Sequence, residues 1–254
     1  MLGKLMKYEF KATFRTFLPL FGALIIAAAF SSLSATWGQR APNIIAYTLS
    51  IFIIIAIAVV TFVITIQRFS KNLIGDEGYL MFTLPTRPGN LIFSKLFAAA
   101  IWQIVSVLVV FLAVGIMLLG SPVLEDIAYG LREAWNWLAQ IGINNGLVVA
   151  ELIIAAIAMV CASVLTLYCC IAIGMLANRH RGLLSFAAFI VISVIEQIIS
   201  SIVVRAGLLN FFDGLNINAS IHAGLWLFIG IMVITGGIFY LITRYMLKNK
   251  LNLE

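Results

Sequence analysis

Long apolar runs, broken by short polar stretches, dominate the pattern along the chain. Six of these runs reach the length of about 20 residues that a helix needs to cross a hydrocarbon core roughly 30 Å thick. We expect spanning helices near residues 17–35, 43–66, 91–119, 146–177, 183–204 and 222–244. The pattern therefore predicts an all-α integral membrane protein with six transmembrane helices, forming one domain over residues 1–254.

Residues 1–16 carry a different pattern, with apolar side chains three and four positions apart. Lys4, Lys7, Lys11 and Arg15 fall largely off that apolar stripe. Such a helix buries its apolar face among acyl chains and sets its cations against anionic headgroups. We favour an interfacial helix here over the alternative, a cytosolic extension of the first span.

Two further segments between spans keep an amphipathic character. In residues 120–145, Ser121 and Pro122 form a favourable helix start, and Trp135 and Trp137 are suited to the headgroup region. We expect a short amphipathic helix at the outer leaflet, acting as a connector or as a lid. Residues 206–221 mix glycine, asparagine and large apolar residues, which suits a partly inserted, re-entrant outer element.

Composition agrees with a membrane location and gives the chain an orientation. The chain is 63% hydrophobic and 10% charged, whereas soluble domains carry about 25% charged residues. Thirteen of the 16 Lys and Arg residues fall on one side of the six-span arrangement, and only Arg40, Arg132 and Arg205 fall on the other. This positive-inside pattern predicts a multi-pass protein with both termini in the cytoplasm. It also explains the net charge of +6 without a nucleic-acid partner.

Catalytic and metal-binding motifs are missing from the sequence. His180 and His222 are expected on opposite sides of the membrane, so they cannot share a metal ion or a proton relay. No phosphate-binding loop, H-E-x-x-H, C-x-x-C or G-x-S-x-G motif occurs. Cys161, Cys169 and Cys170 all fall within the fourth span, where we interpret them as small buried residues.

Acidic residues inside spans are the next candidates for function. A charge at the centre of a spanning helix costs roughly 2.5–3.5 kcal/mol on insertion scales. Glu196 lies in the outer part of the fifth span and is followed by Gln197 and Ser200. These residues either line a polar translocation path or form an interhelical hydrogen bond near the interface. Glu151, near the outer end of the fourth span, is a weaker candidate because a carboxylate costs little there.

The polar segment at 67–90 is the most distinctive part of the chain. Its apolar patch is unusual for a solvated loop and needs a partner surface, either the bilayer or another protein. Pro85 and Pro88 exclude a continuous helix. The residues expected to make the contact are Asp76, Glu77, Gly78, Tyr79, Leu80, Phe82, Leu84 and Pro85.

This segment resembles the inner loop of type 2 ABC exporter permeases, of the style common in Gram-positive bacteria. The family pattern has an acidic residue followed by glycine, then a Leu-Pro pair, and then a lysine that opens the third span. The matching residues here are Glu77 and Gly78, Leu84 and Pro85, and Lys95. The opening amphipathic helix, the six spans and the cytoplasmic termini are similar to that family as well.

The resemblance implies a plasma-membrane permease whose inner loop couples to a separate ATPase. It implies two cytosolic ABC ATPase subunits, and a second permease subunit that is identical or paralogous. This chain is then no enzyme and binds no cofactor, because ATP and Mg belong to the partner ATPase. The implied cargo is amphipathic: an antimicrobial peptide, a drug or a lipid.

Three alternatives remain open at this stage. The first is a proton-coupled secondary transporter that uses Glu196. The second is a non-transporting membrane sensor or assembly subunit. The third, a membrane enzyme such as an intramembrane protease, lacks the clustered carboxylates or histidines that it would need.

Overall fold

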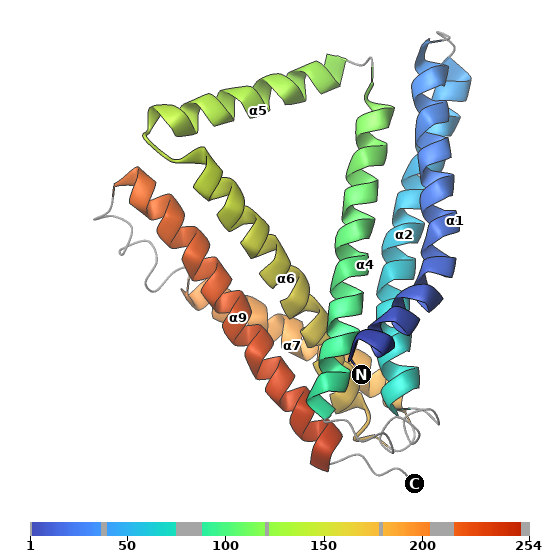
Figure 1. Cartoon of the computed structure of the whole chain (residues 1–254), viewed down its shortest axis with the longest axis vertical. Coiled ribbons are helices and arrows are strands. Elements are labelled where there is room, and N and C mark those ends of the chain that lie inside the picture. Colours follow the sequence, from blue (N-terminus) through green and yellow to red (C-terminus); the bar gives the residue numbers. More distant parts are fainter. Residues whose placement is uncertain are drawn as a thin grey trace. The chain divides into compact units, whose positions relative to one another are not determined.

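The computed structural model describes residues 2–36, 40–74, 88–119, 122–177, 180–203 and 216–249. Within these ranges the regular elements are all helices (Figure 1). They are α1 (Leu2–Thr36), α2 (Arg40–Ile74), α4 (Pro88–Met117), α5 (Pro122–Gln140), α6 (Asn145–Gly174), α7 (Arg181–Val203) and α9 (Ile217–Asn249).

Six of these helices are long and apolar enough to cross a membrane, which confirms the all-α membrane fold. Their spanning stretches lie where the apolar runs predict them. A separate helix, α5, starts at Pro122, so the sequence also predicts this element correctly. The last span begins earlier than expected, because residues 217–221 of the predicted re-entrant segment already belong to α9. Residues 206–215 of that segment lie outside the described residues.

The chain divides into two compact units. The first comprises residues 1–67 and 93–134 and holds α1 and most of α2, α4 and α5. Its core forms where α1, α2 and α4 pack together, and it consists of Phe17, Phe21, Leu24, Ala28, Ile57, Ala113 and Met117. The four core residues of α1 are spaced three or four positions apart, so they form one face of that helix.

Hydroxyl groups join the helices of this first unit. Ser31 Oγ lies 3.3 Å from Ser50 Oγ, and Thr61 Oγ1 lies 3.4 Å from Ser106 Oγ. The Tyr47 hydroxyl donates to the carbonyl of Met117 over 3.3 Å. Since lipid is as apolar as leucine, interhelical hydrogen bonds of this kind help to hold membrane helices together, at about 0.6 kcal/mol each on average.

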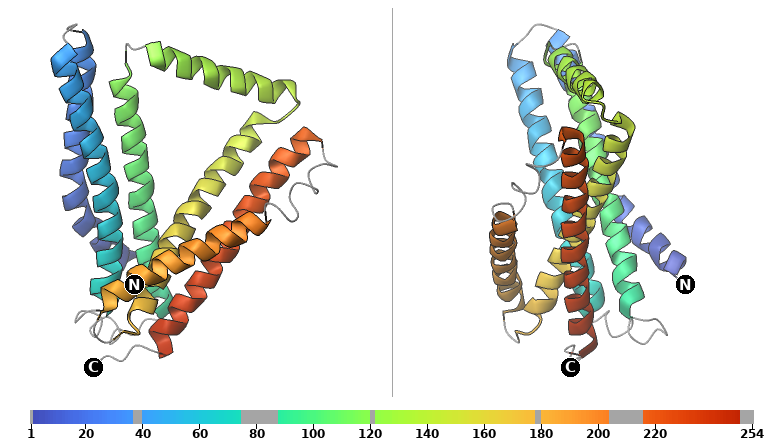
Figure 2. Two further views of the ribbon diagram at one scale, coloured as in Figure 1. Left: turned by 180° about the vertical axis from the view of Figure 1, so that it is seen from behind. Right: turned by 90° about the vertical axis from the view of Figure 1, so that its left-hand side faces the viewer.

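Within α1 the axis bends, and the N-terminal turns leave the direction of the spanning part (Figure 2). Pro19 lies inside this helix. Its ring removes one backbone donor and crowds the carbonyl of Arg15, which is a common cause of helix kinks. The candidate span begins at Thr13, so the basic turns before it are continuous with the span. Their position at the membrane interface stays a prediction.

The second unit comprises residues 68–92 and 135–254, and in it α6 packs against both α9 and α7. Small residues set the spacing of these helices. A Cβ at Gly236 of α9 would lie 3.6 Å from Cα of Ala162 and 3.5 Å from Leu165. A Cβ at Gly174 of α6 would lie 2.8 Å from the carbonyl oxygen of Arg181 and would collide with Ser185 of α7. Close backbone approach at small residues is the usual way in which membrane helices gain packing energy.

The ends of α2 and α4 that flank residues 75–87 belong to this second unit. Phe69, near the end of α2, stacks on Tyr168 of α6 with ring centroids 4.0 Å apart. At the start of α4, a Cβ on Gly89 would lie 2.8 Å from the hydroxyl oxygen of Tyr240 on α9. Both flanks of the polar segment are therefore packed against the two longest helices of the unit.

Candidate functional site

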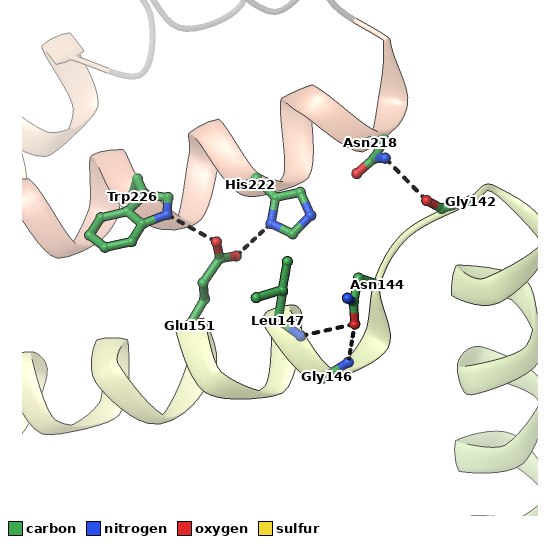
Figure 3. Close-up of polar contacts among 8 residues, drawn as sticks. All are labelled: Gly142, Asn144, Gly146, Leu147, Glu151, Asn218, His222 and Trp226. Atoms are coloured by element: carbon green, nitrogen blue, oxygen red, sulfur yellow. Dashed lines mark hydrogen bonds and ion pairs between the residues drawn. The ribbon is translucent and has the colours of Figure 1, made fainter.

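A buried carboxylate joins α6 to α9 in the second unit (Figure 3). Glu151 of α6 is only 9% exposed. Its Oε2 lies 2.7 Å from Nδ1 of His222, and its Oε1 accepts a hydrogen bond of 2.9 Å from the indole N–H of Trp226. Both carboxylate oxygens are therefore held by side chains of α9. We refer to Glu151, His222 and Trp226 as the polar cluster.

Local sequence places each member of the polar cluster. On α6, Val148, Glu151 and Ala155 are buried and are spaced three and four residues apart, so they share one face. On α9, His222 and Trp226 are four residues apart and likewise share a face. The contact between α6 and α9 brings the two faces together.

The turn before α6 fixes the level at which that helix begins. The Asn144 side chain accepts from the amides of Gly146 and Leu147, which is a standard helix N-cap. Gly142 has φ of +78°, a conformation that glycine adopts without strain. Its carbonyl accepts from Asn218 of α9 over 3.3 Å (Figure 3). The turn before α6 and the first turn of α9 are thereby joined beside the polar cluster.

The polar cluster pairs a carboxylate with an imidazole. An ionised carboxylate only accepts hydrogen bonds, so Nδ1 of His222 carries the shared hydrogen when Glu151 is ionised. The side chain of His222 is 25% exposed. Ionisable groups inside membrane helices commonly mark substrate or proton pathways. The cluster is therefore the described site best suited to such a role.

Metal binding does not fit the polar cluster. Only Glu151 and His222 offer ordinary ligand atoms there, because the indole of Trp226 is a donor. Across the part of the chain that the structure describes, no three His, Cys, Asp or Glu side chains gather closely enough to hold a metal ion. All three cysteines are free thiols, and Cys169 and Cys170 are buried, as the sequence predicts.

Glu196 lies at a different place in the same unit. It interacts with the side chain of Thr166 on α6, and Cys170 lies nearby. Thr166 is 15 residues beyond Glu151, about 22 Å along the helix. Gln197 and Ser200 are exposed on α7. The structure therefore does not bring these three predicted path residues together with the polar cluster, and their role stays a prediction.

The predicted coupling residues Asp76, Glu77, Gly78, Tyr79, Leu80, Phe82, Leu84 and Pro85 lie outside the described residues. Of the predicted interface anchors, Lys7, Lys11 and Arg15 are exposed, as are Trp135 and Trp137, whereas the side chain of Lys4 is outside the described set. Lys95, which matches the family pattern, is buried.

Sequence reasoning missed the polar cluster as a unit. It assigned Glu151 to the interface and treated His222 as an isolated histidine. A usable signal was present, since both residues lie near outer ends of their spans and Trp226 follows His222 by one helical turn. What the sequence could not supply was the pairing of α6 with α9.

Comparisons of the chain with protein-family models, with curated proteins and with solved structures found no match. The resemblance to type 2 ABC exporter permeases therefore depends on the residues quoted above.

Proposed function

We propose that this chain is the transmembrane subunit of an ATP-driven type 2 ABC exporter that moves an amphipathic substrate out of the cell. The observation that carries the proposal is the inner segment with Glu77, Gly78, Leu84 and Pro85, followed by Lys95 at the start of α4. A separate ATPase supplies the nucleotide chemistry, and a second permease subunit completes the translocation path.

The geometry of the second unit supports this reading. The two flanks of the inner segment pack on Tyr168 and Tyr240, which lie on α6 and α9. The same two helices carry the polar cluster at their other ends. Glu151 and Tyr168 are 17 residues apart, about 26 Å along α6. A displacement of the inner segment would therefore act directly on the helix pair that holds the cluster.

Reversing the charges of the inner acidic pair tests the coupling. We expect Asp76→Lys with Glu77→Lys to weaken binding of an ABC ATPase encoded beside this chain by about tenfold or more, the size of a moderate interface contact. Co-purification and the ATPase activity of the reconstituted complex are the measurements.

The matched control reverses Glu125 and Asp126, an exposed acidic pair on α5 that is expected on the opposite side of the membrane. This variant should bind the ATPase like the unaltered chain. Equal binding by both variants, or no binding by the unaltered chain, would contradict the proposed coupling role.

The polar cluster favours one second candidate, a proton-coupled secondary transporter. The 2.7 Å contact between His222 and Glu151 is a better proton-carrying group than Glu196 alone. Liposomes that contain this chain without any ATPase separate the two functions. Uptake of an amphipathic dye driven by an imposed pH gradient would support proton coupling, whereas uptake only with ATPase and ATP supports the exporter.

A further inference from the structure

A groove lined with aromatic rings lies in the first unit, between the N-terminal half of α1 and the middle of α4. Its volume is about 470 Å³. The walls come from Phe10, Phe14 and Phe21 on α1 and from Ile101, Trp102 and Val105 on α4, and Lys11 is the one charged residue in the lining. All of these residues belong to one compact unit.

The aromatic wall is organised around Trp102. Its ring stacks on Phe17 with centroids 5.0 Å apart, and Phe10 and Phe14 lie 6.1 and 6.4 Å away. The indole Nε1 is buried and has no hydrogen-bond partner among the described residues. A buried donor without an acceptor is uncommon in proteins.

The dimensions of the groove match one lipid tail. Phe10 and Phe21 are 11 residues apart, which is at most about 16 Å along α1. This is close to half of the roughly 30 Å hydrocarbon core, the depth that a single acyl chain occupies. The groove begins before the candidate span of α1 at Thr13, so in the predicted arrangement it opens toward the headgroups.

Positively charged side chains beside the groove favour a lipid with an anionic headgroup. Lys7, Lys11 and Arg15 follow one another at intervals of four residues, so they form a stripe along α1, and all three are exposed. The aromatic stripe of Phe10 and Phe14 lies directly next to it. A cation near the membrane surface attracts anionic lipids by roughly 1 kcal/mol. The groove therefore combines an apolar channel with a positive rim.

We propose that this groove is a binding site for an anionic phospholipid, with one acyl chain along Trp102 and the headgroup phosphate against Lys11. The site holds a resident lipid, and its occupation requires neither ATP nor a partner ATPase. It is therefore independent of the proposed export function.

Quenching of Trp102 fluorescence by brominated lipids tests the proposal. The chain is reconstituted in phosphatidylcholine, and mid-chain dibrominated phosphatidylglycerol or dibrominated phosphatidylcholine is then titrated in. The fluorescence of Trp102 is obtained by subtracting the fluorescence of the Trp102→Phe variant from that of the unaltered chain. We expect the anionic lipid to bind about fivefold more tightly than the zwitterionic lipid, and Lys11→Gln to remove most of that preference.

Two pairs of variants, one at lysines and one at valines, test whether the lipid binds in the groove. Lys248→Gln removes an exposed lysine from the last turn of α9 and should leave the preference unchanged. Val105→Phe fills the groove and should reduce quenching by both lipids, whereas Val107→Phe, at a position 48% exposed on the same helix, should not.

Three results would overturn the proposal. The first is equal binding of the two lipids by the unaltered chain, and the second is an equal response to Lys11→Gln and Lys248→Gln. The third is protection of Trp102 from both brominated lipids, which would mean that a protein segment or a second copy of the chain covers the groove.

Discussion

At the scale of single residues, Glu151 has the most specific surroundings in the described chain. Its two oxygens accept from two donors on one neighbouring helix, at 2.7 and 2.9 Å. Hydrogen bonds to charged groups are worth about 1.5–3 kcal/mol each, and removal of one partner leaves the other unsatisfied. Glu151 is thus a structural link between α6 and α9.

Removal of this carboxylate gives a direct prediction for stability. We expect Glu151→Ala to lower the free energy of unfolding in detergent by about 1–3 kcal/mol, because the donors of His222 and Trp226 lose their acceptor in a buried place. Glu151→Gln should cost less, since its amide still accepts from Trp226 and donates to His222. The measurement is thermal unfolding followed by loss of the monodisperse species.

Glu125→Ala serves as the control, because it removes an exposed carboxylate from α5 and should leave unfolding unchanged. If Glu151→Ala unfolds at the same temperature as Glu125→Ala, the polar cluster does not stabilise the pairing of α6 with α9.

The acidic residues and the cysteines show which features of single residues could be predicted from the sequence and which could not. The cost of an intramembrane charge singled out Glu196, because that residue lies deeper in its predicted span than Glu151 does. The structure gives Glu151 the stronger hydrogen bonds, since depth along a helix carries no information about which neighbouring helix supplies a partner. Cys169 and Cys170 are buried as predicted, whereas Cys161 is only partly buried.

At the scale of elements, hydrophobic periodicity and length were sufficient to predict all six spans and α5. Pro122 marks the start of α5 because proline tolerates the first helical turn. The first turn of α9 was missed because Asn218 and Ser220 reduce its apolar character. In the structure, Asn218 bonds to Gly142 and Ser220 bonds to the backbone of its own helix.

The crossing of α6 and α9 yields a prediction about side-chain size. Gly236 has room for a methyl group, since its ideal Cβ meets Ala162 and Leu165 at 3.5–3.8 Å. We expect Gly236→Ala to be near neutral and Gly236→Leu to cost about 1–3 kcal/mol through overpacking. Unfolding in detergent again provides the measurement.

The neighbouring glycine is a matched control for this substitution. A Cβ at Gly237 would meet nothing within 4 Å, so Gly237→Leu should be tolerated. Equal destabilisation by Leu at both positions would show that close packing at the crossing does not determine the effect.

At the scale of the whole molecule, the uneven distribution of basic residues is the feature that assigns sides to the membrane. Thirteen Lys and Arg residues on one side against three on the other predict cytoplasmic termini and a cytoplasmic inner segment. The helices alone do not define this orientation, because their lengths and apolar character are the same in either direction.

Labelling of single cysteines in intact cells tests that orientation. We expect Asp126→Cys on α5 to react with a membrane-impermeant maleimide from outside, and Asp76→Cys in the inner segment to react only after lysis. The native thiols add little background, because Cys169 and Cys170 are buried and Cys161 is partly covered within a spanning helix. Labelling of Asp76→Cys in intact cells would place the inner segment where no cytosolic ATPase can reach it, and the exporter proposal would then fail even if the fold and the polar cluster are correct.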